Sequence, residues 1–279
     1  MMLSKFLHKV IICFSSSLFF LSVSKAQELF VFTEPASNMS AGSLGIRLNN
    51  YLMDENNSGR LDYVLAPEAM VGVNKKLMLH AETFLSDRKN GNFSFNGVAA
   101  YGKYRFYSID EVHSHFRMAV FGRISSSNIS VIQQAIDLYG SNSGFETGLI
   151  ATKLLNKFAF SSSASWLHAW DNAGGNKFIA NDHRNAIGYS LSIGKLLLPK
   201  NYVSYKQVNL NGMVELLGQY NAGSKAGFAD VAPSLQFIFN SVARVDLAYR
   251  FKIGGDLQRN ADNTGLLRFE YNFFNLFSK

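Results

Sequence analysis

The stretch LLRFEYNFFNLF, residues 266–277, closes the chain and carries the pattern that decides the fold. Arg268, Glu270 and Asn272 alternate with apolar residues, as expected for the two faces of a β-strand. In a soluble β-sandwich such an apolar face forms the core. In an outer-membrane barrel it meets lipid, and the charged face lines the lumen. The alternating apolar residues of this stretch are Leu267, Phe269, Tyr271 and Phe273.

The same alternation recurs along the rest of the chain. In VARVDLAYRFKI, residues 242–253, Asp246, Arg250 and Lys252 share one face, and apolar residues share the other. Segments of this kind, each roughly ten residues long, repeat between turn signals from Ser43 to about Phe274. We count about 12 of them, which is an even number, as bacterial barrels require.

The connections between these segments alternate in length and composition. Polar, mostly longer connections rich in glycine and asparagine alternate with short ones, which fits the long extracellular loops and short periplasmic turns of bacterial barrels. We therefore predict an all-β fold, a transmembrane antiparallel up-and-down β-barrel of about 12 strands over residues 43–279, in the cell outer membrane. A large secreted β-sandwich is the alternative. The short connections are expected at Asn74-Lys75, Ile109–His115, Asn156-Lys157, Pro199–Tyr202 and Asn240-Ser241.

Residues 1–26 have the layout of a secretory signal peptide. Lys5 and Lys9 precede an apolar run from Val10 to Val23, and small residues follow at the expected cleavage position. Residues 27–42 are then an N-terminal segment, either a periplasmic tether, a piece of chain folded into the lumen, or an extra β-segment. The only cysteine, Cys13, falls within residues 1–26, so the rest of the chain has neither disulfides nor cysteine-bound metal.

Charge and hydropathy exclude other classes of protein. Residues 1–26 carry three of the 27 Lys and Arg residues and none of the 20 Asp and Glu residues, so the remainder has a mild net charge of about +4. Such a balance, with no run of five like charges, does not indicate a nucleic-acid partner. After residue 26 no stretch of apolar residues is long enough for a membrane-spanning helix.

Three stretches resemble a family of uncharacterised Gram-negative outer-membrane β-barrels. They are SGFETGLIATKLL (143–155), GYSLSIGKLLLPKNYVSYKQVNLNGMVELLGQ (188–219) and LLRFEYNFFNLF (266–277). That family is distantly similar to porin-like transporters named after the MetA pathway of phenol degradation. The resemblance covers most of the chain and implies a barrel in the outer membrane. It implies no substrate, because none of the three stretches contains a known catalytic or binding motif.

Charged residues on the inward faces are the candidate pore lining. Both signs occur among them, so they either form a polar passage or fill the barrel with ion pairs. Glu68 and His80 share these faces. Arg123, Arg250, Lys252 and Arg268 are expected in the outer half of the lumen, where an unpaired cluster would attract anions. The candidate pore-lining residues are Arg47, Glu82, Lys103, Arg105, Arg117, Arg123, Glu215, Asp246, Arg250, Lys252, Arg268 and Glu270.

The sequence favours a passive channel or transporter for small solutes over two alternatives: an enzyme that modifies lipid or lipopolysaccharide, and a closed structural or adhesive barrel that acts through its loops. His113 and His115 have the spacing of half a metal site, but a solvated turn is the favoured interpretation. His168, between Trp166 and Trp170, is interpreted as part of an interfacial aromatic belt rather than as the base of a catalytic serine–histidine pair. We predict no enzymatic activity, metal or cofactor. The expected partners are outer-membrane lipid, lipopolysaccharide, the barrel-insertion machinery and small solutes.

Overall fold

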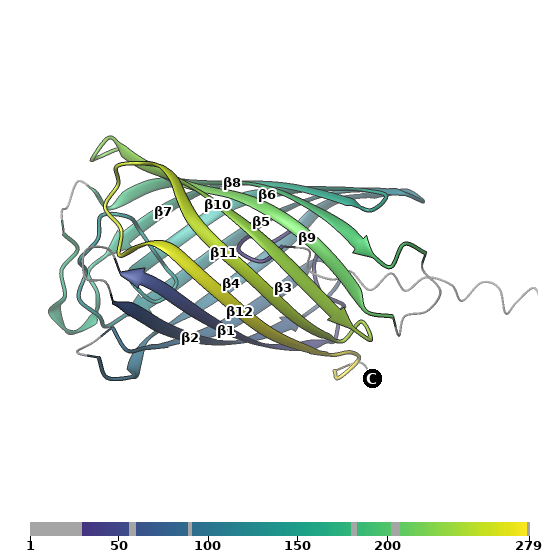
Figure 1. Cartoon of the computed structure of the whole chain (residues 1–279), viewed down its shortest axis with the longest axis horizontal. Coiled ribbons are helices and arrows are strands. Elements are labelled where there is room, and N and C mark those ends of the chain that lie inside the picture. The colour runs from purple at the N-terminus through teal and green to yellow at the C-terminus, as the bar shows by residue number, and fades with distance from the viewer. Residues whose placement is uncertain (1–29, 56–59, 89–90, 180–182, 202–206, 278–279) are drawn as a thin grey trace, which may run out of the picture.

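The protein is a closed barrel of twelve antiparallel strands, which confirms the predicted fold class (Figure 1). The computed structural model describes residues 30–55, 60–88, 91–179, 183–201 and 207–277, so the expected signal peptide lies outside the described residues. The strands are β1 (Leu44–Glu55), β2 (Leu61–Gly72), β3 (Leu77–Ser86), β4 (Ser94–Asp110), β5 (Ser114–Ser127), β6 (Ser143–Leu155), β7 (Phe158–Trp170), β8 (Asn185–Leu198), β9 (Asn209–Asn221), β10 (Ala226–Phe239), β11 (Ala243–Gly255) and β12 (Ala261–Phe273).

Each strand pairs with its neighbours in sequence, and β1 pairs with β12 to close the sheet. At this seam Leu44 lies opposite Phe273 and Arg47 lies opposite Glu270. Closure leaves no free sheet edge, so the backbone of the wall is hydrogen-bonded on both sides of each strand. A short 3-10 turn, η2 (Ala173–Gly175), follows β7, and within the described ranges no helix is long and apolar enough to cross a membrane.

The wall is apolar outside and charged inside. Leu191 is 56% exposed and Ile253 55% exposed on the outer face, whereas the inward Lys103, Glu215 and Asp246 are fully buried. A water-soluble domain has the opposite distribution, because charged residues are almost never fully buried unless they are paired. The alternation along the strands, such as the strict alternation of buried with partly exposed residues in β2, therefore indicates an outer face that meets hydrocarbon.

The connections alternate as predicted, with two corrections. The connection expected at Pro199–Tyr202 extends from Leu198 to Asn209, and part of it lies outside the described residues. Conversely, the glycine-rich stretch after Asn221 is mostly strand. Residues 226–230 already pair with β9, so β10 contains Asp230, although a composition rich in glycine is typical of a loop. The small residues of this glycine-rich stretch still allow the hydrogen-bonded ladder between β9 and β10 to continue.

The quoted C-terminal stretch also begins and ends differently from the prediction. β12 starts at Ala261, five residues before Leu266, and ends at Phe273. The chain then turns at the barrel end, where the N–H of Phe277 donates to the carbonyl of Gly42 at 3.0 Å.

A charge placed on the outer face tests this orientation. Leu191→Arg, near the middle of β8, should lower the free energy of unfolding in lipid vesicles by about 2–4 kcal/mol, because the arginine would enter hydrocarbon. Ser190→Ala, on the inward face of the same strand, is the control. Denaturant titration followed by heat-modifiable gel mobility measures both. A change within about 0.5 kcal/mol for Leu191→Arg would mean that this face meets water.

Candidate functional site

The described part of the N-terminal segment, residues 30–42, runs through the inside of the barrel and is called the lumenal segment below (Figure 1). Phe30 and Val31 are 1% and 2% exposed and pack against Ala159, Met213 and Leu266, which come from three different strands. The segment therefore occupies space that the inward side chains of the wall leave open.

Glu215 on β9 holds the beginning of the lumenal segment. One carboxylate oxygen accepts the backbone N–H groups of Val31 and Phe32, both at 2.9 Å. The other accepts the N–H of Thr33 at 2.8 Å and its hydroxyl at 2.6 Å. Three successive N–H groups of a non-strand segment thus find an acceptor, and the fully buried carboxylate gains four charge-assisted hydrogen bonds.

Glu34 anchors the middle of the segment to the opposite wall. Its carboxylate lies 3.1 Å from Nζ of Lys103 and 3.4 Å from the guanidinium of Arg47, and Lys103 also donates to the carbonyl of Pro35 at 2.7 Å. Burial would raise the pKa of Glu34, but the charges of Lys103 and Arg47 outweigh burial and hold the pKa well below its usual value.

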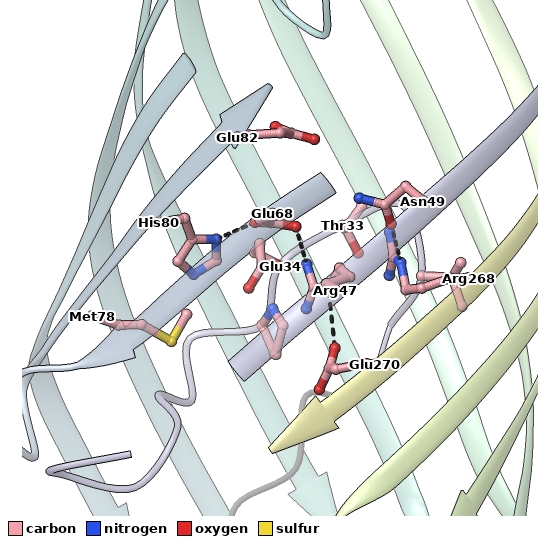
Figure 2. A network of polar contacts seen from close by, with 12 residues as sticks. Thr33, Glu34, Arg47, Asn49, Glu68, Met78, His80, Glu82, Arg268 and Glu270 are labelled. Atoms are coloured by element: carbon pink, nitrogen blue, oxygen red, sulfur yellow. Dashed lines mark hydrogen bonds and ion pairs between the residues drawn. The ribbon is translucent and has the colours of Figure 1, made fainter. Parts of the chain in front are cut away.

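Arg47 is the centre of a chain of buried ion pairs, which Figure 2 shows in close-up. Besides Glu34 it contacts Glu68 at 3.0 Å and Glu270 at 2.9 Å. Glu68 in turn bonds Nδ1 of His80 at 2.5 Å. These residues come from β12, β1, β2 and β3, so the network joins the two strands that close the barrel to their neighbours.

From the other end of the barrel, the loop between β5 and β6 folds inward. Gln219 on β9 both accepts from the N–H of Ile136 and donates to its carbonyl, each at 2.9 Å. Leu138 is 1% exposed and packs with Leu167 of β7. The ring of Tyr139 lies 4.0 Å from the guanidinium carbon of Arg123, close enough for a cation–π contact.

Between the lumenal segment and this loop lies a chamber of about 300 Å³. Its lining is of mixed chemistry, with serine hydroxyls on β7 and β8, aromatic rings, and charged groups. Representative lining residues are Phe32, Tyr101, Phe121, Glu146, Ser165 and Ser190.

The structure brings most of the predicted lining charges into the lumen. Most of them are buried and form ion pairs or hydrogen bonds with each other or with the lumenal segment, whereas Arg250 and Lys252 are half-buried. Arg105 lies apart, at the barrel end, where it donates to the carbonyl of Lys75 in the β2–β3 turn. A β-bulge between Arg105 and Tyr107 breaks the inward–outward alternation of β4, from which Arg105 was expected to lie deeper in the lumen. Arg117 lies near the same end and pairs with Asp110 at 2.8 Å.

The expected unpaired cationic cluster is not found. Each of its four members has a carboxylate partner, and two of those partners were not among the predicted residues. The pairs are Arg123–Glu82 at 2.9 Å, Arg250–Asp230 at 2.7 Å, Lys252–Asp262 at 3.6 Å and Arg268–Asp246 at 3.5 Å.

Sequence reasoning missed several lumenal charges for different reasons. Arg244 has the parity of Asp246 on the same strand, so the alternation already pointed to it. Asp230 was hidden because its strand resembled a loop. Glu34 and Arg259 lie outside the strands, where no periodicity reports which way a side chain faces. Arg259 approaches Asp230 to 2.5 Å.

The histidine motifs fall outside the lumenal site. His115 bonds Asp110 at 2.8 Å beside the β4–β5 turn. His168 points outward among the rings of Phe145 and Trp166, and its Nδ1 lies 2.8 Å from Oδ1 of Asn185. Among the residues that the structure describes, no three His, Cys, Asp or Glu side chains gather in a way that could hold a metal ion.

Comparison with known proteins bears on the fold. No protein-family model matches the chain, and no curated protein sequence matches it significantly. Among solved structures, the COG4313 outer membrane channel from Pseudomonas putida F1 aligns with a TM-score of 0.53 and 11% identity, covering 88% of this chain and all of that one. The KdgM porin aligns with a TM-score of 0.50 and 9% identity, covering 82% of this chain and 99% of that one. This chain shares their barrel fold.

The paired state of the lumenal cations can be tested at Asp230. Asp230→Asn keeps the shape of the side chain but removes the charge that faces Arg250 and Arg259, so the channel should shift toward anion selectivity. Reversal potentials in a KCl gradient measure the shift. Asp110→Asn, at the half-exposed Asp110 near the barrel end, is the matched control and should change selectivity less. Unchanged selectivity in Asp230→Asn would contradict the pairing.

Proposed function

We propose that this protein is an outer-membrane channel for the passive movement of small solutes, and that the lumenal segment controls whether the lumen is open. The fold it shares with the COG4313 channel and the KdgM porin supports the proposal, and so does its apolar exterior. No substrate follows from the likeness. Contacts with lipopolysaccharide and with the barrel-insertion machinery remain predictions.

One observation carries the proposal: the wall of this barrel does not fill its own lumen. Barrels of eight strands are filled by their inward side chains, whereas twelve strands enclose a wider space. Here the extra space contains the lumenal segment, the inward loop and a chamber of about 300 Å³. A barrel built only as a rigid anchor has no need of a polar chamber lined by Glu146, Ser165 and Ser190.

The segment is attached by contacts that are reversible. Polar bonds from Glu215, Thr152 and Lys103 hold residues 31–36, which are not part of a strand. Its departure would expose an inner wall that is rich in serine hydroxyls on β7 and β8 and in paired charges on β1 to β5. Such a surface is wettable and suits small polar solutes.

The enzyme alternative has less support. A hydrolase needs a nucleophile and a base within hydrogen-bond reach. His168 lies on the outer face with Asn185 as its partner, and the inward serines bond mainly to other hydroxyls, as in the Ser163–Ser190 pair at 2.6 Å. The purified protein should accordingly show no phospholipid or lipid A hydrolysis.

Loosening the segment should open the channel. Glu215→Gln leaves one acceptor oxygen and places an NH₂ group where the other oxygen now accepts two hydrogen bonds. Loss of even one charge-assisted bond should raise the open probability at least about tenfold. Single-channel recording in planar bilayers measures this.

The control is Glu146→Gln, the same change at a lumenal carboxylate that bonds Ser165. It should alter selectivity at most and leave the open probability unchanged. Equal open probabilities in wild type and Glu215→Gln, with both barrels folded, would refute control by the segment. The absence of conductance in every variant would refute the channel itself.

A further inference from the structure

Three buried methionines and a histidine gather at one end of the lumen. Met39 belongs to the lumenal segment, Met70 to β2, and Met78 and His80 to β3. Their exposed fractions are 7%, 1%, 0% and 5%. The ladder between β2 and β3 sets Met70 opposite His80 and Gly72 opposite Met78, so the three wall residues point inward side by side.

The methionine ends converge from different directions. The three side chains form one packed cluster, and the N–H of Met39 points at the sulfur of Met78, 3.5 Å away. A Cβ placed on Gly45 of β1 would lie 2.6 Å from Cε of Met70 and 3.3 Å from Cε of Met39. Both thioether ends therefore lie over the same glycine, which leaves room for them.

His80 presents a lone pair to this cluster. Because a Glu68 carboxylate can only accept, the hydrogen bond of 2.5 Å between them places a proton on Nδ1 of His80. In the neutral ring Nε2 is then an acceptor, and in the structure it is buried without a hydrogen-bond partner. Figure 2 shows this edge of the ring turned toward the side chain of Met78.

We propose that Met39, Met70, Met78 and His80 form a binding site for a soft monovalent cation, Cu(I). Thioether sulfur and imidazole nitrogen are ligands that Cu(I) accepts, and thioether sulfur selects against hard cations such as Mg²⁺ and Ca²⁺. The carboxylate behind His80 has the orienting role that outer partners of metal-bound histidines commonly have. These four residues offer neutral ligands only, which suits a cation of low charge.

Packing explains part of the cluster but not all of it. Methionine is a common filler of irregular gaps, and the lumenal segment needs such a contact surface. Filling does not require a buried imidazole nitrogen without a partner, which costs free energy unless something binds it. A bound cation would supply that partner and would also tie the lumenal segment, through Met39, to β2 and β3.

The test is Cu(I) binding to the full-length processed protein, folded in detergent under reducing conditions, in competition with a colorimetric Cu(I) chelator. We expect one Cu(I) per chain. Met78→Leu and His80→Gln should each weaken binding by at least about tenfold, the effect expected even for outer-shell changes. Met213→Leu is the matched control, because Met213 is also buried, inward-facing and in contact with the lumenal segment.

Folding of each variant is checked by heat-modifiable mobility, and Met70→Leu replaces Met78→Leu if the latter does not fold. X-ray absorption of the wild-type Cu(I) complex provides a readout independent of the variants and should show both sulfur and nitrogen neighbours. Binding that is equal in Met213→Leu and in the cluster variants, the absence of stoichiometric binding, or a copper shell of oxygen only would each overturn the proposal.

Discussion

Hydrocarbon offers no hydrogen-bond partner to a peptide group, and the rest of this structure depends on that constraint. Every strand must pair on both sides, so β12 returns to β1 and the sheet closes. Closure turns one face of each strand toward lipid and the other toward an enclosed space. Charged residues can occupy that space only if they are paired, as Arg47 is with Glu68 and Glu270.

The same requirement shapes what fills the lumen. Residues 31–36 of the lumenal segment are not part of a strand, yet Val31 and Ala36 are buried. Glu215 supplies an acceptor for three of the segment's N–H groups, and Thr152 accepts from Ala36. The attachment of the lumenal segment therefore depends on side-chain acceptors, which a single substitution can remove without breaking the wall. A removable closure within a stable wall is what a gated passage needs.

How far the sequence predicted this arrangement depends on periodicity. Where strands alternate strictly, as around Asp246 and Arg268, the inward residues follow from parity alone. The ion-pair partners could not be predicted from parity, because pairing depends on the register between strands and on where loop residues lie. Arg250 meets Asp230 across the β10–β11 ladder, and Arg123 meets Glu82 from a strand that is not its neighbour. The position of residues 30–42 was left open, since an irregular segment carries no period.

The central claim is that the lumenal segment lies against the wall and closes the lumen, and a disulfide can test it directly. Thr33 Oγ1 lies 3.0 Å from Ser192 Oγ, and no cysteine occurs after residue 26 to compete. In the double variant Thr33→Cys with Ser192→Cys, we expect a disulfide that keeps single-channel conductance low until a reductant restores the openings seen in wild type. Failure of the two cysteines to bond, or conductance that the disulfide leaves unchanged, would contradict the account.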